Sequence, residues 1–246
     1  MSIAIGIDIG GTGIKGARVD VASGELLSER CKLPTPIGGE PEAVADTVRE
    51  VLSMIGAKAD EPLGVCFPAV VLHGRTMSAA NVSQRWIGFD AETFFEDELA
   101  RPIHFVNDAD AAGIAEVQYG AAQERTGLVL LTTLGTGIGS ALIHNGILIP
   151  NSELGHLEMN GKDAERQAAY SAKEREGLDW VEWTSRLQQY YTMLERLFSP
   201  ELLVIGGGVS KAAEEFIPLL KLNTEVVPAT LRNNAGILGS AFLATQ

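Results

Sequence analysis

Residues 7–19 read IDIGGTGIKGARV, a glycine-rich turn that lies between two strand-like segments. Residues 3–9, before the turn, are rich in isoleucine, and residues 17–21, after it, alternate apolar and polar side chains. This pattern predicts two strands joined by the glycine turn. Glycine permits positive φ angles and a close approach of the backbone, so the N–H groups of such a turn can surround a phosphate.

The stretch also fits the formula of a dinucleotide-binding loop, G-x-G-x-x-G, from Gly11 to Gly16. That fingerprint requires a helix after its glycines, whereas a strand is predicted here. A P-loop is excluded as well, because Ala17 stands where the P-loop formula requires a lysine. Two interpretations remain, a phosphate-binding hairpin and an ordinary glycine-rich hairpin turn, and the further glycine turns at 135–139 and 206–208 favour the first.

In such a hairpin, Thr12 offers a hydroxyl donor and Lys15 a positive charge close to the turn. Asp8, at the end of the first strand, is placed to hold Mg²⁺ through water. The residues predicted to bind phosphate are Gly10, Gly11, Thr12, Gly13 and Lys15.

The glycine stretch has a second copy 124 residues further along the chain. Residues 11–17 (GTGIKGA) and 135–141 (GTGIGSA) are identical at five of seven positions, and each copy follows a predicted strand. A short glycine-rich match can arise by chance, but a duplicated lobe explains the shared context better. The second copy therefore predicts a second phosphate loop, formed by Gly135, Thr136 and Gly137.

The composition is that of a globular protein, with 46% hydrophobic and 21% charged residues among 246. A net charge of -13 argues against a general nucleic-acid surface. Cys31 and Cys66 stand alone in the sequence, which suggests neither a disulfide framework nor a cysteine zinc site. No apolar run approaches the roughly 18 residues of a membrane span, so we expect a soluble, cytoplasmic protein without a membrane partner.

Strand-like and helical segments alternate along the chain, which predicts the α/β class. A helix is expected from Pro41, and a long amphipathic helix over 180–198, with Asp179 and Glu182 as its capping box. Further helices are expected from Ala111 and from Ser210. Further strands are expected at 63–71, 102–106, 128–133 and 202–205.

Four motifs occur in order along the chain: DIGGTGIK at 8–15, NDADAA at 107–112, LGTGIG at 134–139 and ELGH at 153–156. Together they resemble the ROK family of sugar kinases, within the actin-like ATPase superfamily, over nearly the whole chain. The resemblance implies a ribonuclease H-like fold with duplicated α/β lobes, 1–107 and 108–246, around a central cleft. It also implies Mg²⁺-dependent phosphoryl transfer to a hexose, usually at O6, and a homodimer.

Most ROK kinases carry a cysteine-rich zinc segment after the Gly-His pair, but residues 157–165 contain no cysteine. We therefore expect no zinc. This segment, with DWVEW at 179–183, resembles the polyphosphate glucokinase branch of the family. That branch implies inorganic polyphosphate, often beside ATP, as the phosphoryl donor and glucose as the acceptor.

Two other interpretations have to be weighed. The first is an ATP-only ROK kinase of another hexose, such as mannose or an N-acetyl amino sugar. The second is a sugar-responsive repressor, but ROK repressors carry an N-terminal helix-turn-helix and the first strand is expected from residue 3. A polyphosphate-dependent glucokinase is the interpretation that we favour.

Asp108 follows a predicted strand and is our general base, which would accept the proton of the sugar O6 hydroxyl. Asn107 would hold neighbouring hydroxyls, while Asp110 is assigned only to the N-terminus of the following helix. Glu153 and His156 can together bind a pair of adjacent sugar hydroxyls.

Other site residues rest on the resemblance alone. Glu165 matches a further sugar-binding glutamate of the family, with Glu158 as its competitor, and Asn81 matches an asparagine that faces the sugar. The turn with Gly207 and Gly208 would border the nucleotide. Polyphosphate would also need positive charge, for which the candidates are Lys15, Lys162, Lys173, Arg175, Lys211 and Arg232.

Overall fold

The computed structural model describes residues 2–79 and 82–246. It contains two compact units, and each is described by itself. The first is formed by the chain up to Ala115 together with Asn233–Gln246, and the second by Glu116–Arg232.

The first unit is built on a six-stranded sheet in which β3, β2, β1, β5 and β9 follow one another and β4 pairs with β2. The strands β1, β5 and β9 are parallel, and β2 is antiparallel to β1. Their carboxyl ends therefore meet at one edge of the sheet. The bounds are β1 (Ile3–Ile9), β2 (Ile14–Asp20), β3 (Glu25–Leu26), β4 (Cys31–Leu33), β5 (Leu63–Phe67) and β9 (His104–Asn107).

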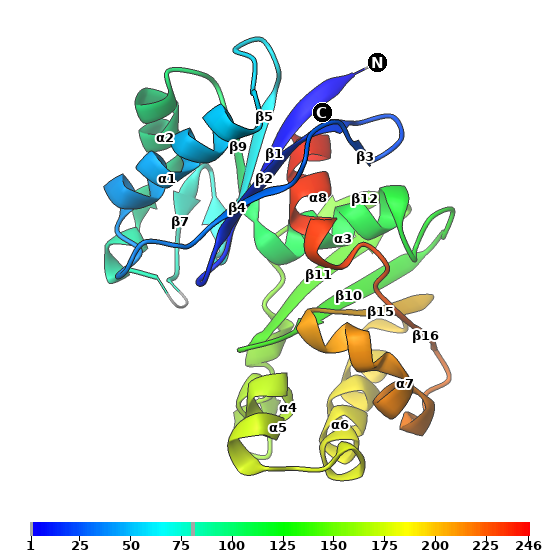
Figure 1. Ribbon diagram of the computed structural model, residues 1–246. Coiled ribbons are helices and arrows are strands. Elements are labelled where there is room, and N and C mark those ends of the chain that lie inside the picture. Colours follow the sequence, from blue (N-terminus) through cyan, green and yellow to red (C-terminus); the bar gives the residue numbers. More distant parts are fainter. Residues whose placement is uncertain (1, 80–81) are drawn as a thin grey trace. The chain divides into compact units, whose positions relative to one another are not determined.

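Helices cover both faces of this sheet (Figure 1). On one face lies α1 (Pro41–Met54), which begins at Pro41 as expected and buries its Val44, Val48 and Val51 side chains. α2 (Ala91–Leu99) packs into the same core, and α8 (Ala235–Leu243) packs against β1 and β5. A small sheet and a 3₁₀ turn complete this unit: β6 (Val71–Leu72), β7 (Arg75–Thr76), β8 (Phe89–Asp90) and η1 (Gln84–Trp86).

The approach of α8 to the sheet depends on two glycines in the strands. A Cβ atom on Gly6 would stand 1.9 Å from the carbonyl oxygen of Ile237, and one on Gly64 would stand 1.9 Å from that of Ser240. Only glycine allows the helix backbone to lie this close to the strands. The compact units are thus divided differently from the lobes expected at 1–107 and 108–246, because residues 233–246 complete the first unit.

The second unit repeats the same sheet, in the order β12, β11, β10, β15, β16. A hairpin of β10 and β11 takes the place of β1 and β2, and β15 and β16 follow in parallel as β5 and β9 do. This agreement confirms the duplication inferred from the repeated glycine stretch. The bounds are β10 (Leu128–Leu134), β11 (Ile138–His144), β12 (Ile147–Ile149), β15 (Leu202–Gly206) and β16 (Glu225–Pro228).

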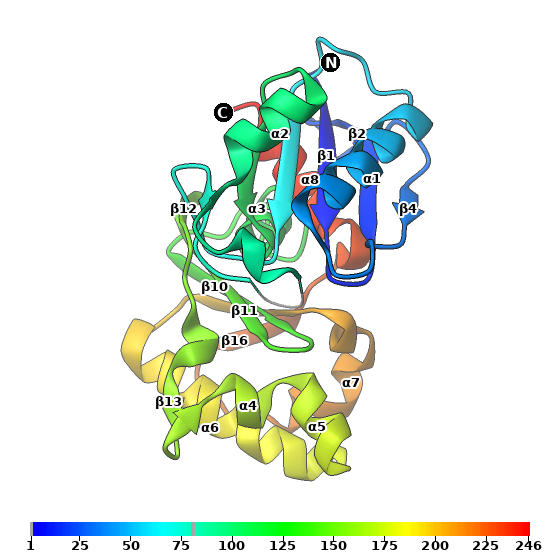
Figure 2. The same ribbon diagram turned by 90° about the vertical axis from the view of Figure 1, so that its left-hand side faces the viewer.

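The helices α4, α5 and α6 gather on one side of β10 and β11 (Figure 2). The longest of them, α6, begins with the expected capping box, in which Asp179 accepts from the backbone N–H of Glu182 at 2.8 Å. Trp183, Leu187 and Tyr191 of α6 pack into the core of the sheet. The bounds are α3 (Asp108–Tyr119), which begins in the first unit, α4 (Glu165–Ala168), α5 (Tyr170–Glu176), α6 (Trp180–Phe198) and α7 (Ala213–Phe216).

Short elements connect these helices and strands. They are β13 (Glu158–Met159), β14 (Lys162–Asp163), η2 (Leu154–His156), η3 (Gly208–Ala212), η4 (Ile217–Leu219) and η5 (Arg232–Asn234). Two expected helix starts were wrong. α3 begins at Asp108 rather than at Ala111, because Asn107 caps it, and Ser210 lies within η3. Among the helices in the described part of the chain, none is both long and apolar enough to cross a membrane.

Candidate active site

The first glycine turn closes the hairpin of β1 and β2. Its strands pair up to Ile9 and Ile14, and the N–H of Gly10 donates to the carbonyl oxygen of Gly13 at 3.0 Å. The Thr35 hydroxyl donates to the Gly10 carbonyl oxygen at 2.5 Å and fixes the turn from the side. Gly11 and Thr12 are exposed at its tip. The turn therefore presents backbone groups to solvent, as a phosphate loop requires.

Asp8 and Lys15 lie opposite each other in this hairpin. They are cross-strand partners, and the Lys15 Nζ lies 2.8 Å from the Asp8 Oδ2. Both side chains are largely buried, with exposed fractions of 16% and 21%, so the pair is shielded from bulk water. The Lys15 ammonium group, predicted to bind phosphate, is thus paired with the Asp8 carboxylate.

Asp108 lies at the same sheet edge as Asp8. Asp8 pairs with Cys66 across β1 and β5, and Phe67 pairs with Asn107 across β5 and β9. Asp108 follows directly and opens α3. Burial raises the pKa of the Cys66 thiol well above its usual value, and the negative charges of Asp8 and Asp108 raise it further. Both carboxylates thus act electrostatically on one buried point.

Asn107 uses its amide for local structure. Its Oδ1 accepts from the backbone N–H groups of Ala109 at 2.8 Å and Asp110 at 3.0 Å, and its Nδ2 donates to the Ala69 carbonyl oxygen at 2.9 Å. It caps the first turn of α3, and so it fixes where the Asp108 backbone lies. A direct contact of Asn107 with sugar stays a prediction. Asn81, the other predicted amide, lies outside the described residues.

The second glycine turn closes the hairpin of β10 and β11 in the same way. The N–H of Gly135 donates to the Gly137 carbonyl oxygen at 3.0 Å. Ser171 of α5 then holds the turn, because its N–H donates to the Gly135 oxygen at 3.0 Å and its hydroxyl to the Thr136 oxygen at 2.6 Å. Both predicted phosphate loops are therefore hairpin turns braced by a hydroxyl side chain.

The turn at 206–208 lies against the second hairpin. Gly207 has a φ of +82°, and a Cβ atom there would stand 2.4 Å from the carbonyl oxygen of Leu134. Glycine is thus required by both backbone conformation and space. A Cβ atom on Gly208 would meet no atom within 4 Å, so this position faces open space.

Glu153 directly precedes the short 3₁₀ turn η2, and His156 is the last residue of this turn. The His156 Nε2 lies 3.8 Å from the Glu153 Oε2, so the two predicted sugar-binding groups are neighbours. Gly155 between them packs on the first residue of β11: a Cβ atom there would stand 2.4 Å from the carbonyl oxygen of Ile138. This contact explains the glycine of the ELGH motif, because it places η2 directly against the second glycine turn.

Glu165, at the start of α4, joins this cluster. Its Oε2 accepts from the backbone N–H of Ile138 at 3.2 Å. Burial raises the pKa of the Glu153 carboxyl, and the negative charge of Glu165 adds to this shift while His156 opposes it. The competitor Glu158 lies exposed on β13 and pairs with Asp163 across the small hairpin. The geometry therefore favours Glu165 over Glu158.

Sequence reasoning missed Asp163. The His156 Nδ1 lies 3.2 Å from the Asp163 Oδ2, an interaction that orients the imidazole. Ligand atoms of His156, Asp163 and Glu165 lie within 4.8 Å of one another, so these three side chains could hold a divalent cation. Nothing in the sequence singles out Asp163, because the small β13–β14 hairpin alone brings it back to His156.

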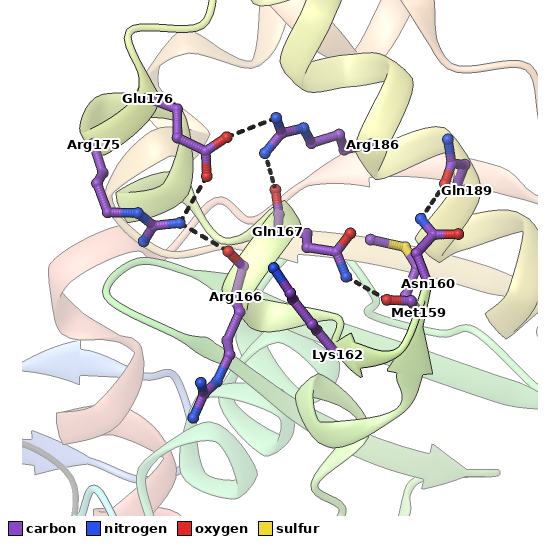
Figure 3. Close-up of a pocket in the computed structure, with 9 residues that line it drawn as sticks. All are labelled: Met159, Asn160, Lys162, Arg166, Gln167, Arg175, Glu176, Arg186 and Gln189. Carbon is purple, nitrogen blue, oxygen red and sulfur yellow. Dashed lines mark hydrogen bonds and ion pairs between the residues drawn. The ribbon is translucent and has the colours of Figure 1, made fainter.

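Two of the six cations considered for polyphosphate line one pocket in the second unit. Lys162 and Arg175 line it together with Arg166 and Arg186, which the sequence did not indicate (Figure 3). Lys173 instead lies over the Trp180 ring, with its Nζ 4.3 Å from the ring centroid. The other three, Lys15, Lys211 and Arg232, do not line this pocket.

Known proteins resemble this chain along nearly its whole length. The ROK family profile matches residues 4–177. A polyphosphate glucokinase from Mycobacterium tuberculosis is 48% identical over 238 residues, which cover 96% of this chain and 89% of that protein. The crystal structure of an inorganic polyphosphate/ATP-glucomannokinase from Arthrobacter sp. strain KM is 50% identical, with a TM-score of 0.93 over 100% of this chain and 99% of that one.

A more distant match extends the likeness of the fold. A ROK family glucokinase from Streptomyces griseus, solved with glucose and AMPPNP, is 23% identical and has a TM-score of 0.84 over 99% of both chains. The repeated sheet of both units is accordingly that of the actin-like ATPase fold. With its profile match over 4–177 and relatives at about half identity along nearly its full length, the chain belongs to the ROK family.

Proposed function

We propose that this chain is a polyphosphate-dependent glucokinase, which transfers a phosphoryl group from inorganic polyphosphate, and also from ATP, to the 6-hydroxyl of glucose. The observation that carries the proposal is its 48% identity, over 96% of its length, to a polyphosphate glucokinase. The 50% identity to a polyphosphate/ATP-glucomannokinase supports ATP as a second donor and makes mannose a second acceptor worth testing.

Asp108 would act as the general base. In the transfer, the carboxylate accepts the proton of the sugar O6 hydroxyl, the O6 atom bonds to the terminal phosphorus, and the bond from that phosphorus to the rest of the donor breaks. The donor leaves one phosphate shorter. The position of Asp108 supports this role, because it follows β9 at the edge where the carboxyl ends of the parallel strands meet.

The sugar would be bound by Glu153, His156 and Glu165. A carboxylate accepts from a sugar hydroxyl and an imidazole N–H donates to one, so this cluster can hold adjacent hydroxyls with matched polarity. The 3.8 Å between Glu153 and His156 supports the assignment, since two neighbouring hydroxyls need two neighbouring partners. Asn81 and Asn107 remain further candidates for the same sugar.

The two glycine hairpins would bind the donor phosphates, Gly10 to Gly13 and Lys15 in the first and Gly135 to Gly137 in the second, with Gly207 and Gly208 beside the second. Backbone N–H groups and the Lys15 ammonium neutralise charge on the transferring group. The Asp8 carboxylate fits a Mg²⁺ ion held through water, because Mg²⁺ keeps most of its own water ligands. When bound, the ion would neutralise donor phosphate charge. A homodimer in the cytoplasm belongs to the same proposal.

A coupled assay for glucose 6-phosphate with either long-chain polyphosphate or ATP as donor tests the function. We expect turnover with both. If ATP supports turnover and polyphosphate does not, the chain is an ATP-only kinase and the proposal fails.

The general base is tested separately with Asp108→Asn, which keeps the size of the side chain. We expect kcat to fall by about 10²–10⁴-fold while glucose binding, measured by calorimetry, persists. Asp110→Asn, two residues further along α3, is the matched control and should lose far less activity. More than about a hundredth of the wild-type rate in Asp108→Asn contradicts the assignment.

A further inference from the structure

The second unit contains a pocket of about 770 Å³ that lies outside the hairpins and the sugar cluster. Its walls come from the β13–β14 hairpin and from α4, α5 and α6 (Figure 3). The lining residues are Met159, Asn160, Lys162, Arg166, Gln167, Arg175, Glu176, Arg186 and Gln189.

The lining carries a strong excess of positive charge. Lys162, Arg166, Arg175 and Arg186 line the pocket with a single carboxylate, that of Glu176, in a chain whose net charge is -13. Because the rest of the chain is acidic, such a gathering of cations is not explained by average composition. It makes this pocket a site of positive potential to which a polyanion is attracted.

Glu176 fixes two of these cations. Its Oε1 accepts from the Arg175 Nη2 at 2.9 Å, and its Oε2 lies 2.7 Å from the Arg186 Nη2. The two guanidinium groups also donate to the backbone, Arg175 to the Arg166 oxygen and Arg186 to the Gln167 oxygen, as the dashed lines of Figure 3 show. Both guanidinium groups are therefore held in place before any ligand binds. This lowers the loss of side-chain entropy on binding.

Lys162 and Arg166 are different. Within residues 2–79 and 82–246, no carboxylate oxygen lies within 4.0 Å of the charged nitrogens of either side chain. In Figure 3 the Lys162 ammonium points in between Arg166 and Gln167, and no dashed line reaches the charged end of either side chain. The Lys162 ammonium and the two fixed guanidinium groups form a set of donors for phosphate oxygens, and the Arg166 guanidinium, which points away from them in Figure 3, adds a fourth cation.

The same helices connect this pocket to the second phosphate hairpin. Arg166 follows Glu165, whose carboxylate accepts from the Ile138 N–H at the end of that hairpin. Arg175 lies one helical turn after Ser171, which donates twice to the hairpin turn. A chain of phosphates that reaches the hairpin would thus find further cations along α4 and α5.

We propose that this pocket binds the part of a polyphosphate chain that lies beyond the phosphate being transferred, an inference that rests on the proposed function. Polyphosphate fits better than a nucleotide, because none of the nine lining residues is aromatic and a nucleobase would have no ring to stack on. Each internal phosphate carries one negative charge, and the lining offers four cations.

The test combines a binding and a kinetic measurement on the full chain. The double variant Lys162→Gln with Arg166→Gln removes both cations that lack a carboxylate partner, and Lys173→Gln, a cation of α5 outside the pocket, is the matched control. We expect the Kd for long-chain polyphosphate to rise by at least about tenfold in the double variant and to stay unchanged in the control. The KM values for ATP and glucose should not change.

Lys162→Gln alone changes an exposed position, so it should fold normally and still show part of the rise in Kd. Circular dichroism of each variant would reveal a folding defect. Equal Kd values for polyphosphate in all variants overturn the proposal that this pocket binds the chain. This holds even if the wild type turns over polyphosphate and the proposed function stands. If the wild type shows no turnover with polyphosphate but the Kd pattern holds, the proposed function fails and the pocket stands.

Discussion

Gly155 offers the sharpest test of how the sugar cluster is positioned. A Cβ atom at this residue would stand 2.4 Å from the carbonyl oxygen of Ile138, whereas ordinary van der Waals contact begins at 3.4 Å. Gly155→Ala therefore demands a displacement of 1.0 Å. β11 resists it, because Ile138 pairs with Leu134 of β10, and further along, the strand lies between β10 and β12. The turn η2 has to move instead, together with the Glu153 and His156 side chains.

The magnitude follows from the displacement. A misplacement of about 1 Å in groups that position a substrate can cost about 10²-fold in rate. Overpacking of this kind also lowers the free energy of unfolding by about 1–3 kcal/mol. We therefore expect kcat/KM for glucose to fall by about 10²-fold in Gly155→Ala, while the chain still folds.

The assay is the coupled measurement of glucose 6-phosphate with glucose varied at saturating donor, beside urea unfolding of the same samples. Gly146→Ala is the matched control, since a Cβ atom there meets no atom within 4 Å and its φ of +80° alone opposes the substitution. The control should lose stability without losing kcat/KM. If Gly155→Ala keeps kcat/KM within about threefold of wild type, η2 does not position the sugar.

Three further outcomes are expected. Asp179→Ala removes the cap of α6 and should lower the free energy of unfolding by about 0.5–2 kcal/mol in urea titrations, and an unchanged midpoint would contradict the capping role. Gly6→Ala should destabilise the first unit severely, since its Cβ atom would stand 1.9 Å from the Ile237 oxygen, and proteolysis near α8 should accelerate. Burial raises the pKa of Glu153, so the native state binds its proton more tightly than the unfolded state, and stability is lost as pH rises through the range above the ordinary value of 4.5. Glu153→Gln should remove that loss, measured as the difference in unfolding free energy between about pH 4 and about pH 7, and an identical pH dependence in both proteins would refute it.

The sequence predicted the parts of the fold that depend on local pattern. The two hairpins follow from isoleucine-rich strands that flank glycine turns, and α6 follows from its periodic apolar face and its capping box. The repeat of the glycine stretch predicted the repeated sheet, because identical turns demand identical strand pairs on either side.

Contacts between segments that are distant in the sequence could not be predicted. Gly6 and Gly64 allow α8 to pack closely on the first sheet. Glycine within a strand often marks a close backbone approach, but it does not indicate which segment approaches. Asp163 reaches His156 only through a two-residue strand, and Arg166 lines the same pocket as Arg186 only because the four-residue helix α4 packs against α6. Such elements are too short to give a periodic pattern.

The placement of α8 has a consequence for how the chain folds during synthesis. The first unit needs residues 233–246, and these leave the ribosome only after the whole second unit has been made. Until then α8 does not cover the sheet at Gly6 and Gly64. The first unit, although most of it is synthesised first, is therefore the last to be completed. Since the second unit is one continuous stretch, it can fold first. The N-terminal strands complete their packing only when the C-terminal helix has been made.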